Sequence, residues 1–496
     1  MVEGVGKKRW VIPFALLATG ATVPFAFAPY GLWPLLPALF AFLFYTWHRV
    51  PVKTAAWRGF WFGLGMFGHG VWWIQVSIHQ FGLPVHAFSI GMTLLFVAFM
   101  SLYPALVGGT TAYLLPKHAQ ARIWGLPALW VLGESLRGWA FSGFPWLQLG
   151  YSQIEGPLAG YVPLLGALGA SLAVTLLASL LCVIVTNRLW RLRAGVFALV
   201  IVATGSVLKN RHWTDTDGPA ARVALVQGAV PQAIKWQARY REQSIALYES
   251  LSAPHWGVEL IVWPETSLPA FPDEVQETLA KLSERAVAHG SGLLVGMPRG
   301  DRHGGAYFNS VQLVAPQGQA YDKHHLVPFG EYLPFDFWLR PLLDFLSIPM
   351  SDFTPGSAHQ SPLASGRLRI GVSICYEDAY ASEVRKPLPS ANVLVNVSDD
   401  AWFGDSIAPH QHLEISRMRA LETGRDLLRA TNTGISAIID ARGAIRARSP
   451  QFVPFVLTGE FQPRRGFTPY ARLGDWPVLA ISMAMLGIAM GRRRPS

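Results

Sequence analysis

The sequence is poor in charged residues and in cysteine. Charged residues make up 15% of its 496 positions, whereas 51% are hydrophobic. Because ordinary soluble domains contain about 25% charged residues, this deficit indicates a chain with a large lipid-facing part. Of the two cysteines, Cys182 lies in the apolar run LASLLCVIVT, which is typical of a packed small hydrophobe. Cys375 lies in a different setting far along the chain, so we expect it to be a free thiol.

Long apolar runs are frequent. A helix needs about 20 mostly apolar residues to cross the hydrocarbon of a bilayer. Candidate spans lie near residues 10–28, 30–47, 58–78, 87–115, 122–140, 160–187, 194–208 and 475–490. The fifth run is the weakest candidate because it contains Glu134, a carboxylate that the neighbouring Arg137 could neutralise.

Basic residues gather in every second connection between these runs. They precede the first run and follow the second, fourth, sixth and eighth: Lys7, Lys8, Arg9, Arg49, Lys53, Arg58, Lys117, Arg122, Arg188, Arg191, Arg193, Arg492, Arg493 and Arg494. The short connections near 28–30 and 79–86 contain no Lys or Arg. By the positive-inside rule, this pattern predicts eight spans with both termini in the cytoplasm.

This topology also accounts for the net charge of +10. We therefore expect no nucleic-acid partner, which would need a basic face on a folded domain. The first run has an alternative interpretation, because Lys7–Arg9 before it and the small residues Ala26 and Ala28 at its end are typical of a cleavable signal peptide. Its direct continuation into a second apolar run favours a retained helix.

A polar stretch of some 260 residues separates the seventh and eighth runs, and the parity of the spans places it outside the cytoplasm. Strand-like runs at 222–227, 260–265, 292–297, 369–375, 392–398 and 435–440 alternate with helical patterns at 236–251, 273–289 and 408–428. This alternation predicts an α/β domain. We expect a seven-helix membrane domain at 1–211, the α/β domain at 212–470, and a last span with a basic tail at 471–496.

Three residues of the α/β domain could carry chemistry together. Glu265 closes the strand-like run LIVWPE, Cys375 closes RIGVSIC, and Lys323 lies in the loop-like stretch YDKHHLVPFGEYLP. Ligands gather outside the carboxyl ends of strands in such sheets, and a carboxylate, a thiol and an ammonium group suffice for acyl transfer. Each residue alone also fits a structural role, as a turn glutamate, a packed cysteine or a solvated lysine.

The histidines do not predict a metal site. His324 and His325 are adjacent, so on an extended run their side chains point to opposite faces. His410 and His412 could share a face, but no carboxylate or thiolate set at ligand spacing accompanies them. We expect all four to be structural or to support a site indirectly, and predict neither a metal nor another cofactor.

The motifs around the three residues resemble the nitrilase superfamily, and the whole chain is similar to its membrane-fused branch, the apolipoprotein N-acyltransferases. The matching strings are VQGAVPQAIKW, VWPET, DKHHLVPFGEYLP, SICYED and NVSDDAWFGDSIAPHQHLEISRMRALETGR, with GESLRG and GFPWLQLGYSQ in the apolar part. The resemblance implies an αββα sandwich with the triad Glu265, Lys323 and Cys375. It also implies supporting roles for the residues Trp236, Glu331, Tyr376 and Glu377.

The resemblance further implies a reaction at the bacterial inner membrane, in a periplasmic domain. Cys375 would take an acyl chain from a phospholipid as a thioester and pass it to the α-amine of the diacylglyceryl-cysteine of an apolipoprotein. Glu265 would act as the base and Lys323 would stabilise the oxyanion. The segment 332–350, rich in Phe, Trp and Leu, is interpreted as an interfacial arm, with a buried loop as the alternative.

Two other functions compete with acyl transfer. One is a membrane-tethered amidase or nitrilase that hydrolyses a small C–N substrate, with the spans as a mere anchor. The other is a transporter or scaffold with an inactive enzyme domain, although transport paths usually carry ionisable residues and only Glu134 is a clear candidate within the spans. We expect a monomer, because the domain needs no partner to complete its triad.

Overall fold

The computed structural model describes residues 3–82, 84–116, 118–300, 305–315, 318–337, 340–341 and 352–491. The chain divides into two compact units, one made of residues 1–212 and 472–496 and the other of residues 213–471. Both cysteines are buried and neither forms a disulfide.

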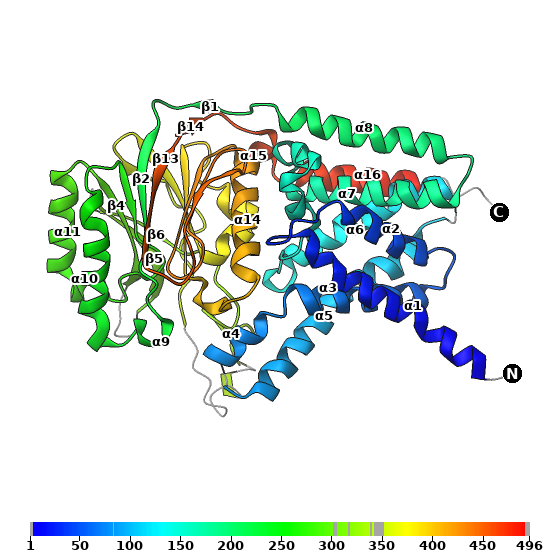
Figure 1. Ribbon diagram of the computed structural model, residues 1–496, viewed down its shortest axis with the longest axis horizontal. Helices are drawn as coiled ribbons and strands as arrows, with labels where there is room; N and C mark the ends of the chain where they lie inside the picture. The colour runs from blue at the N-terminus through cyan, green and yellow to red at the C-terminus, as the bar shows by residue number, and fades with distance from the viewer. Residues whose placement is uncertain are drawn as a thin grey trace. The chain divides into compact units, whose positions relative to one another are not determined.

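The first unit is helical (Figure 1). Its helices are α1 (Glu3–Thr22), α2 (Leu35–Thr46), α3 (Val52–Gly70), α4 (Ile74–Phe81), α5 (His86–Leu114), α6 (Ala119–Trp139), α7 (Val162–Thr186), α8 (Arg191–Lys209) and α16 (Trp476–Gly491). Among the described residues, three helical stretches are long and apolar enough to cross a membrane: His86–Leu114, Pro157–Thr186 and Arg191–Lys209. Shorter apolar helices are Trp10–Ala26, Leu35–Thr46 and Trp476–Gly491. These lengths indicate a membrane protein without establishing eight spans.

Glycines let three of these helices approach one another closely. A Cβ atom on Gly20 of α1 would lie 2.0 Å from the carbonyl oxygen of Phe62 in α3. A Cβ atom on Gly65 of α3 would lie 2.0 Å from the carbonyl oxygen of Leu17 in α1, and one on Gly59 would lie 2.2 Å from the carbonyl oxygen of Pro104 in α5. Small residues at such contacts are typical of helix packing in membranes, where dispersion forces replace the hydrophobic effect.

Two charged residues of α6, Glu134 and Arg137, hold a non-helical segment inside this unit. The Glu134 carboxylate accepts hydrogen bonds from Trp130 Nε1 (3.1 Å) and from the backbone N–H of Leu149 (3.0 Å). The Arg137 guanidinium donates to the backbone carbonyls of Phe144 (2.8 Å) and Trp146. Both charged side chains therefore fix the segment 144–149. From the sequence we expected only that Arg137 would neutralise Glu134. Irregular backbone at membrane depth needs such partners because lipid offers none.

The second unit contains two six-stranded sheets. The first has the order β13 (Phe455–Phe461), β2 (Ala221–Gln227), β3 (Leu260–Val262), β4 (Gly292–Gly300), β5 (Tyr307–Ala315), β6 (Gln319–Asp322). The second has the order β12 (Ile445–Arg448), β11 (Ala437–Ile439), β10 (Leu427–Thr431), β9 (Val393–Ser398), β8 (Leu368–Ile374), β7 (Leu363–Ser365). Strands β2, β3 and β4 run parallel, as do β8, β9 and β10.

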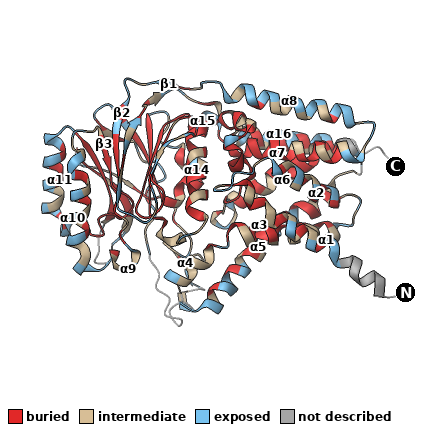
Figure 2. Cartoon of the chain, viewed as in Figure 1, coloured by how far each residue is buried: buried red, intermediate tan, exposed pale blue. Residues whose placement is uncertain are grey.

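Helices cover the outer face of each sheet, which gives four layers (Figure 1). Helices α10 (Arg241–Ser252) and α11 (Gln276–Ala288) pack on the first sheet through Tyr248, Leu282 and Ala286. On the second sheet, α13 (Ala381–Val384) and α14 (Ala408–Thr423) pack through side chains such as Val384 and Leu413. The inner faces of the two sheets form a separate aliphatic core, and Figure 2 shows both sheets buried.

Some predicted elements end elsewhere than expected. The helix expected at 408–428 ends at Thr423, because Gly424 adopts a left-handed conformation (φ 64°) that terminates it. Leu427–Thr431 then forms β10 instead of a last helical turn. The helix expected from residue 273 begins at Gln276, after a short 3₁₀ turn at Pro272–Glu274.

The expected interfacial arm, residues 332–350, lies partly outside the described residues, since 338–339 and 342–351 are not described. In its described part, Phe335 and Phe337 are exposed, with 68% and 83% of their surfaces accessible.

Candidate active site

The three predicted site residues all follow strands of the second unit. Glu265 lies three residues after β3, Lys323 lies directly after β6, and Cys375 lies directly after β8. All three are buried. The ends of two strands of the first sheet and one strand of the second therefore bring together side chains that lie up to 110 residues apart in the chain, as the strand-end argument predicts.

Lys323 lies between two carboxylates. Its Nζ is 2.8 Å from Glu331 Oε2 and 3.8 Å from Glu265 Oε1. Burial alone would lower the pKa of this ammonium group, but Glu331 and Glu265 outweigh it and hold the pKa above its ordinary value. The side chain of Lys323 is 1% exposed, so it is a dry, permanently charged group.

Asn309 of β5 connects the two carboxylates. Its side-chain amide donates to Glu265 Oε1 (2.7 Å) and to Glu331 Oε1 (3.0 Å), and its backbone carbonyl accepts from the N–H of Lys323 (2.8 Å). Glu331 is fixed further by the N–H of Val327, which donates to its Oε2 (2.8 Å). This network places Lys323 within reach of Glu265 without a direct short contact between them.

Glu265 is well suited to exchange a proton. Its Oε2 accepts the backbone N–H of Asp399 at 2.9 Å. Burial raises the pKa of this carboxyl group, the positive charge of Lys323 lowers it, and the negative charge of Glu331 raises it, with a net upward shift. A carboxylate whose pKa is moved toward neutrality accepts protons more readily than an exposed one.

Cys375 begins the 3₁₀ turn η8 (Cys375–Ala379) with φ at 51°, in the left-handed region that non-glycine residues rarely adopt. Its carbonyl oxygen accepts from Asn396 Nδ2 (3.4 Å) and faces His412 Nε2 (3.3 Å). Burial and the nearby Glu265 carboxylate raise the pKa of the thiol well above its usual value, while the positive charge of Lys323 acts against them. The resting thiol is therefore protonated and electrostatically coupled to both partners.

Glu377, two residues later, anchors the turn on the side of Lys323. Its carboxylate accepts the backbone N–H groups of Ile374 (2.8 Å), His324 (2.7 Å) and His325 (3.0 Å), together with the hydroxyl of Tyr321 (3.1 Å). Burial raises the pKa of Glu377 to about 7, although these backbone donors oppose the shift. The contacts of Glu377 are thus to backbone N–H groups and a tyrosine hydroxyl, which fix the turn, and none of them is to the Cys375 thiol.

The other predicted residues are aromatic. Tyr376 accepts a hydrogen bond from the hydroxyl of Tyr380 (3.0 Å), and His325 stacks on Tyr380 with ring centroids 3.7 Å apart. Trp236, at the end of the short helix α9 (Gln232–Lys235), is 51% exposed. It is thus the one predicted site residue that presents a large apolar surface to its surroundings.

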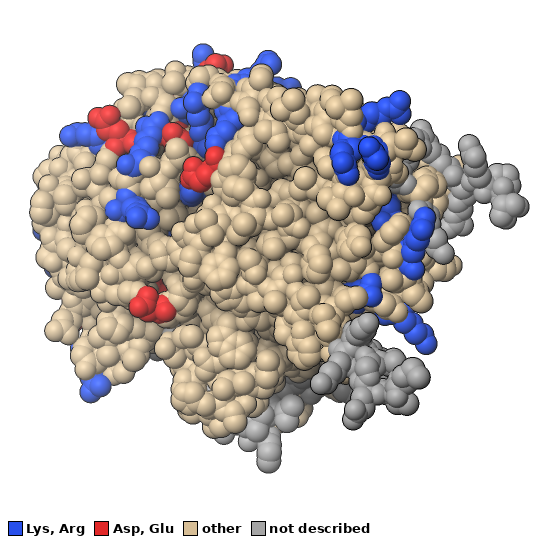
Figure 3. Space-filling view, turned by 45° about the vertical axis from the view of Figure 1, so that its right-hand side comes forward, with Lys and Arg blue, Asp and Glu red and all other residues tan. Residues whose placement is uncertain are grey.

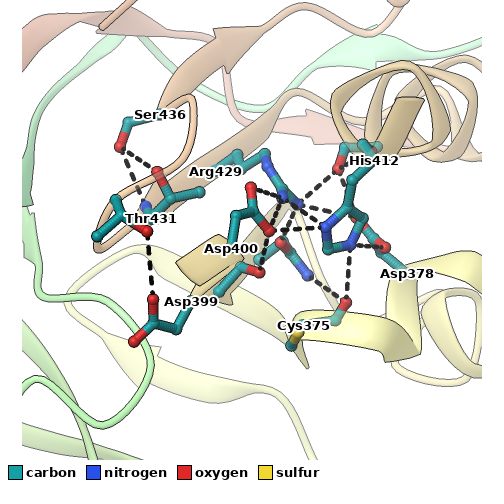
Figure 4. A network of polar contacts seen from close by, with 12 residues as sticks. Cys375, Asp378, Asp399, Asp400, His412, Arg429, Thr431 and Ser436 are labelled. Carbon is teal, nitrogen blue, oxygen red and sulfur yellow. Dashed lines mark hydrogen bonds and ion pairs between the residues drawn. The ribbon is translucent and has the colours of Figure 1, made fainter. Parts of the chain in front are cut away.

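A buried network of charged side chains lies on the other side of the turn (Figure 4). His412 faces Asp378 with Nε2 (2.8 Å) and Asp400 with Nδ1 (2.9 Å). Arg429 contacts Asp378 (3.2 Å) and Asp400 (3.0 Å), and its Nη2 is 2.8 Å from His412 Nδ1. Burial and Arg429 lower the pKa of His412, but the two carboxylates prevail and raise it to about 9. An imidazolium balances the charge, with two carboxylates against two cations.

Sequence reasoning missed several residues of this site, among them Asn309, Asp399 and Lys235, which hold Glu265 by hydrogen bonds. Asp399 directly follows β9, so the strand-end rule that selected Glu265 could have selected it too. Asp378 and His412 lie in strings quoted for the resemblance, and His412 was interpreted as structural, which fits its contacts. Asn309 lies in the middle of a strand, where the sequence alone offers no signal.

Comparison with known proteins identifies both parts of the chain. Residues 19–180 match the family model described as apolipoprotein N-acyltransferase N-terminal domain, and residues 222–469 match carbon-nitrogen hydrolase. A solved carbon-nitrogen hydrolase from Helicobacter pylori is 17% identical, with a TM-score of 0.37; the match covers 55% of this chain and 95% of that one.

Similarity to curated proteins extends over nearly the whole length. The apolipoprotein N-acyltransferase of Methylococcus capsulatus is 43% identical over 481 residues, which cover 96% of this chain and 95% of that protein. The enzyme of the same name from Nitrosomonas europaea is 41% identical, with 96% of each chain covered. With both domains matched and such coverage, the chain belongs to the apolipoprotein N-acyltransferase family.

Proposed function

We propose that this acyltransferase moves a fatty acyl chain from a membrane phospholipid, through a thioester on Cys375, to the N-terminal α-amine of the diacylglyceryl-cysteine of apolipoproteins. The observation that carries this proposal is the buried grouping of Glu265 and Lys323 around the Cys375 thiol. Membership of the apolipoprotein N-acyltransferase family supports a lipid as the acyl donor and a lipoprotein as the acceptor. In this role Cys375 is the nucleophile, Glu265 the general base and Lys323 the oxyanion partner.

In the first half-reaction, Glu265 takes the proton of the Cys375 thiol as sulfur attacks the ester carbonyl. The S–C bond forms, and negative charge develops on the carbonyl oxygen, where the Lys323 ammonium stabilises it. The C–O bond of the ester then breaks, and Glu265 returns the proton to the departing lysophospholipid hydroxyl. Glu265 and Lys323 both interact electrostatically with the Cys375 thiol before any substrate is bound.

In the second half-reaction, the α-amine of the acceptor attacks the thioester carbonyl. Glu265 takes a proton from the amine, the C–N bond forms, and the S–C bond breaks to release the Cys375 thiolate. Lys323 again lies beside the developing oxyanion, and Glu331 holds the ammonium in place through its 2.8 Å ion pair. Splitting one difficult transfer into two easier steps is the general benefit of covalent catalysis.

The membrane arrangement that we propose has eight spans, cytoplasmic termini and a periplasmic catalytic unit in the bacterial inner membrane. Figure 3 supports it, with Lys and Arg side chains gathered at one end of the helical unit beside a broad uncharged surface. Arg49, which follows α2, interacts electrostatically with Arg122 in the first turns of α6, so these two basic connections lie at the same end. One basic end is what the positive-inside rule expects.

The exposed Phe335 and Phe337 support an arm of the catalytic unit that dips into the bilayer interface. Exposed aromatic rings of this kind cost little at the headgroup level, where apolar surface is partly shielded from water. Such an arm would keep the thiol near the ester bonds of the donor lipid. We propose a monomer, because all the groups named in the reaction come from one chain.

The reaction is tested by incubating the purified protein with phospholipid and measuring its intact mass. We expect a mass increase of one acyl chain that Cys375→Ala lacks, and a loss of that increase when a diacylated lipopeptide is added. Lys323→Ala should slow acylation by at least about 10²–10³-fold, the usual effect of removing one oxyanion donor. As a matched control, Lys281→Ala removes an exposed lysine of α11 and should leave the rate unchanged.

Two outcomes would contradict the proposal. If the wild-type protein gains no acyl chain, the covalent route through Cys375 is wrong. If the adduct forms but only water discharges it, with the lipopeptide left unmodified, the protein is a hydrolase with membrane anchors.

A further inference from the structure

Lys235 is a buried lysine that the reaction described above does not use. It ends the short helix α9, and its side chain is 4% exposed. Its Nζ lies 2.5 Å from Asp399 Oδ2 and 3.0 Å from the backbone carbonyl oxygen of Glu265. Lysine is almost never fully buried unless it is paired, so this position has to be explained by its two contacts, and one of them is to the proposed base.

Asp399 connects the same ion pair to the carboxyl group of Glu265. Its backbone N–H donates to Glu265 Oε2 at 2.9 Å, while its side chain accepts from Lys235 and from Asn432 Nδ2 (3.1 Å). Lys235 and Asp399 therefore hold Glu265 at two points, the backbone carbonyl and the catalytic carboxylate. If the Lys235–Asp399 ion pair only contributed to packing, it would not need to contact both the backbone carbonyl and the carboxylate of Glu265.

The polar groups around Glu265 come from six parts of the second unit. The groups that face it are Lys235 on α9, Asn309 on β5, Lys323 after β6, Glu331 in the following loop, Cys375 on η8 and Asp399 after β9. With Glu265 ionised, this cluster holds three carboxylates and two ammonium groups. With Glu265 protonated, the carboxylates and ammonium groups balance.

We propose that Lys235 is a positioning residue for Glu265, which neutralises Asp399 and thereby controls how readily Glu265 gives up and takes protons. This inference rests on the proposed role of Glu265 as the base. Without Lys235, the Asp399 carboxylate beside Glu265 would have no ammonium partner, and the ionised form of Glu265 would be disfavoured. The positive charge of Lys235 acts in the same direction as that of Lys323, since both lower the pKa of Glu265 against the effect of burial.

The test is a double-variant cycle on the pH dependence of Cys375 acylation by phospholipid, measured by intact mass. Acylation requires ionised Glu265, so its rate falls as pH drops through the pKa of that group. In Lys235→Met we expect the acidic midpoint of the profile to rise by about one pH unit, because a nearby positive charge is lost. In Asp399→Asn we expect the midpoint to fall, because a negative charge is lost. The neutral double variant should return toward the wild-type midpoint.

A structural role alone would not produce opposite shifts and a mutual rescue. The inference is overturned if both single variants move the midpoint in the same direction, or if neither moves it while the wild type acylates normally. Lys281→Met, which breaks an exposed ion pair with Glu277 on α11, is the matched control and should keep the wild-type profile. Should Lys235→Met fail to fold, the downward shift in Asp399→Asn and its reversal in the double variant decide the question.

Glu265→Gln separates this inference from the reaction itself. This variant should lose most of the acylation rate, together with the acidic limb. If Glu265→Gln keeps the wild-type profile, Glu265 is not the base, and both proposals about it are wrong. If the profile of Glu265→Gln changes as expected but the Lys235 and Asp399 variants do not, only the role of Lys235 is wrong.

Discussion

Two consecutive carboxylates, Glu377 and Asp378, hold the turn that begins at Cys375 from opposite sides. Glu377 accepts backbone N–H groups from the segment that follows Lys323, whereas Asp378 contacts His412 and Arg429 from α14 and β10. A cysteine keeps its backbone in the left-handed region only where the surrounding structure fixes that conformation. Because His412 also faces the Cys375 carbonyl, the buried network is part of what fixes it.

The charge on His412 leads to a prediction about pH. Its pKa of about 9 in the folded protein is above the ordinary 6.5, so its stabilising contribution is complete below pH 6.5 and is lost as pH rises through 9. We expect the apparent Tm in detergent to fall over this window. His412→Asn should remove that pH-dependent decline and destabilise the protein at pH 7 by about 3–5 kcal/mol, the usual cost of breaking a buried ion pair.

The matched control for His412 lies two residues earlier on the same helix. His410 is half-buried, and burial lowers its pKa, so His410→Asn should cost much less and should leave the decline in place. A wild-type Tm that is constant between pH 6.5 and 9 would show that His412 is not an imidazolium in the folded state.

Single residues differ in how far the sequence could predict them. Glu265, Lys323 and Cys375 follow strands and lie in distinctive strings, so sequence reasoning selected them, although their catalytic roles stay predictions. Lys235 ends a short helix and resembles any solvated lysine, because its partner Asp399 lies 164 residues further along the chain. A contact of that range becomes visible only when β9 and α9 are placed in space.

At the scale of elements, glycine decides how helices meet in one unit and where a helix ends in the other. Gly424 ends α14 and allows Leu427–Thr431 to form a central strand, which helical periodicity alone did not reveal. Neither β5 nor β6 was among the predicted strands, yet their pairing positions Asn309 and Lys323. The carbon-nitrogen hydrolase domain itself is confirmed by the family match over residues 222–469. The alternation of strand-like and helical runs thus predicted an α/β domain better than it predicted where its elements end.

Close packing of α1 against α3 predicts unequal effects of two glycine substitutions. In Gly65→Ala the new methyl group would meet backbone atoms of Leu17 and Ala21, at 2.0 and 2.6 Å, which cannot move aside without shifting α1. We expect a loss of about 1–3 kcal/mol, typical of overpacking, measured as a lower apparent Tm in detergent.

Gly195→Ala on α8 is the control, since no atom lies within 4 Å of its added Cβ. It should leave the Tm unchanged or raise it, because alanine favours a helix over glycine by about 0.5–1 kcal/mol. Equal losses from both substitutions would contradict close packing as the cause.

At the scale of the whole molecule, the eight-span arrangement stays a prediction, and accessibility to a membrane-impermeant maleimide tests it. In a Cys182→Ala, Cys375→Ala background, Glu284→Cys places a thiol on the exposed face of α11, and Arg188→Cys places one between α7 and α8. We expect labelling at 284 in intact spheroplasts, and labelling at 188 only after the membrane is permeabilised. The reverse pattern, or labelling of both in intact spheroplasts, would contradict the topology.

The helical unit is assembled from the two ends of the described chain, with the catalytic unit inserted between them. Val478 and Met485 of α16 complete an apolar cluster with Ala128 and Val131 of α6 and Leu172 of α7. During synthesis, the surface of α6 and α7 that α16 covers therefore stays unpaired while residues 213–471 leave the ribosome. This takes on the order of tens of seconds at common elongation rates. Helix α16, which is made after the catalytic unit, covers this surface, so a ribosome that stalls within the catalytic unit leaves the membrane unit incomplete as well.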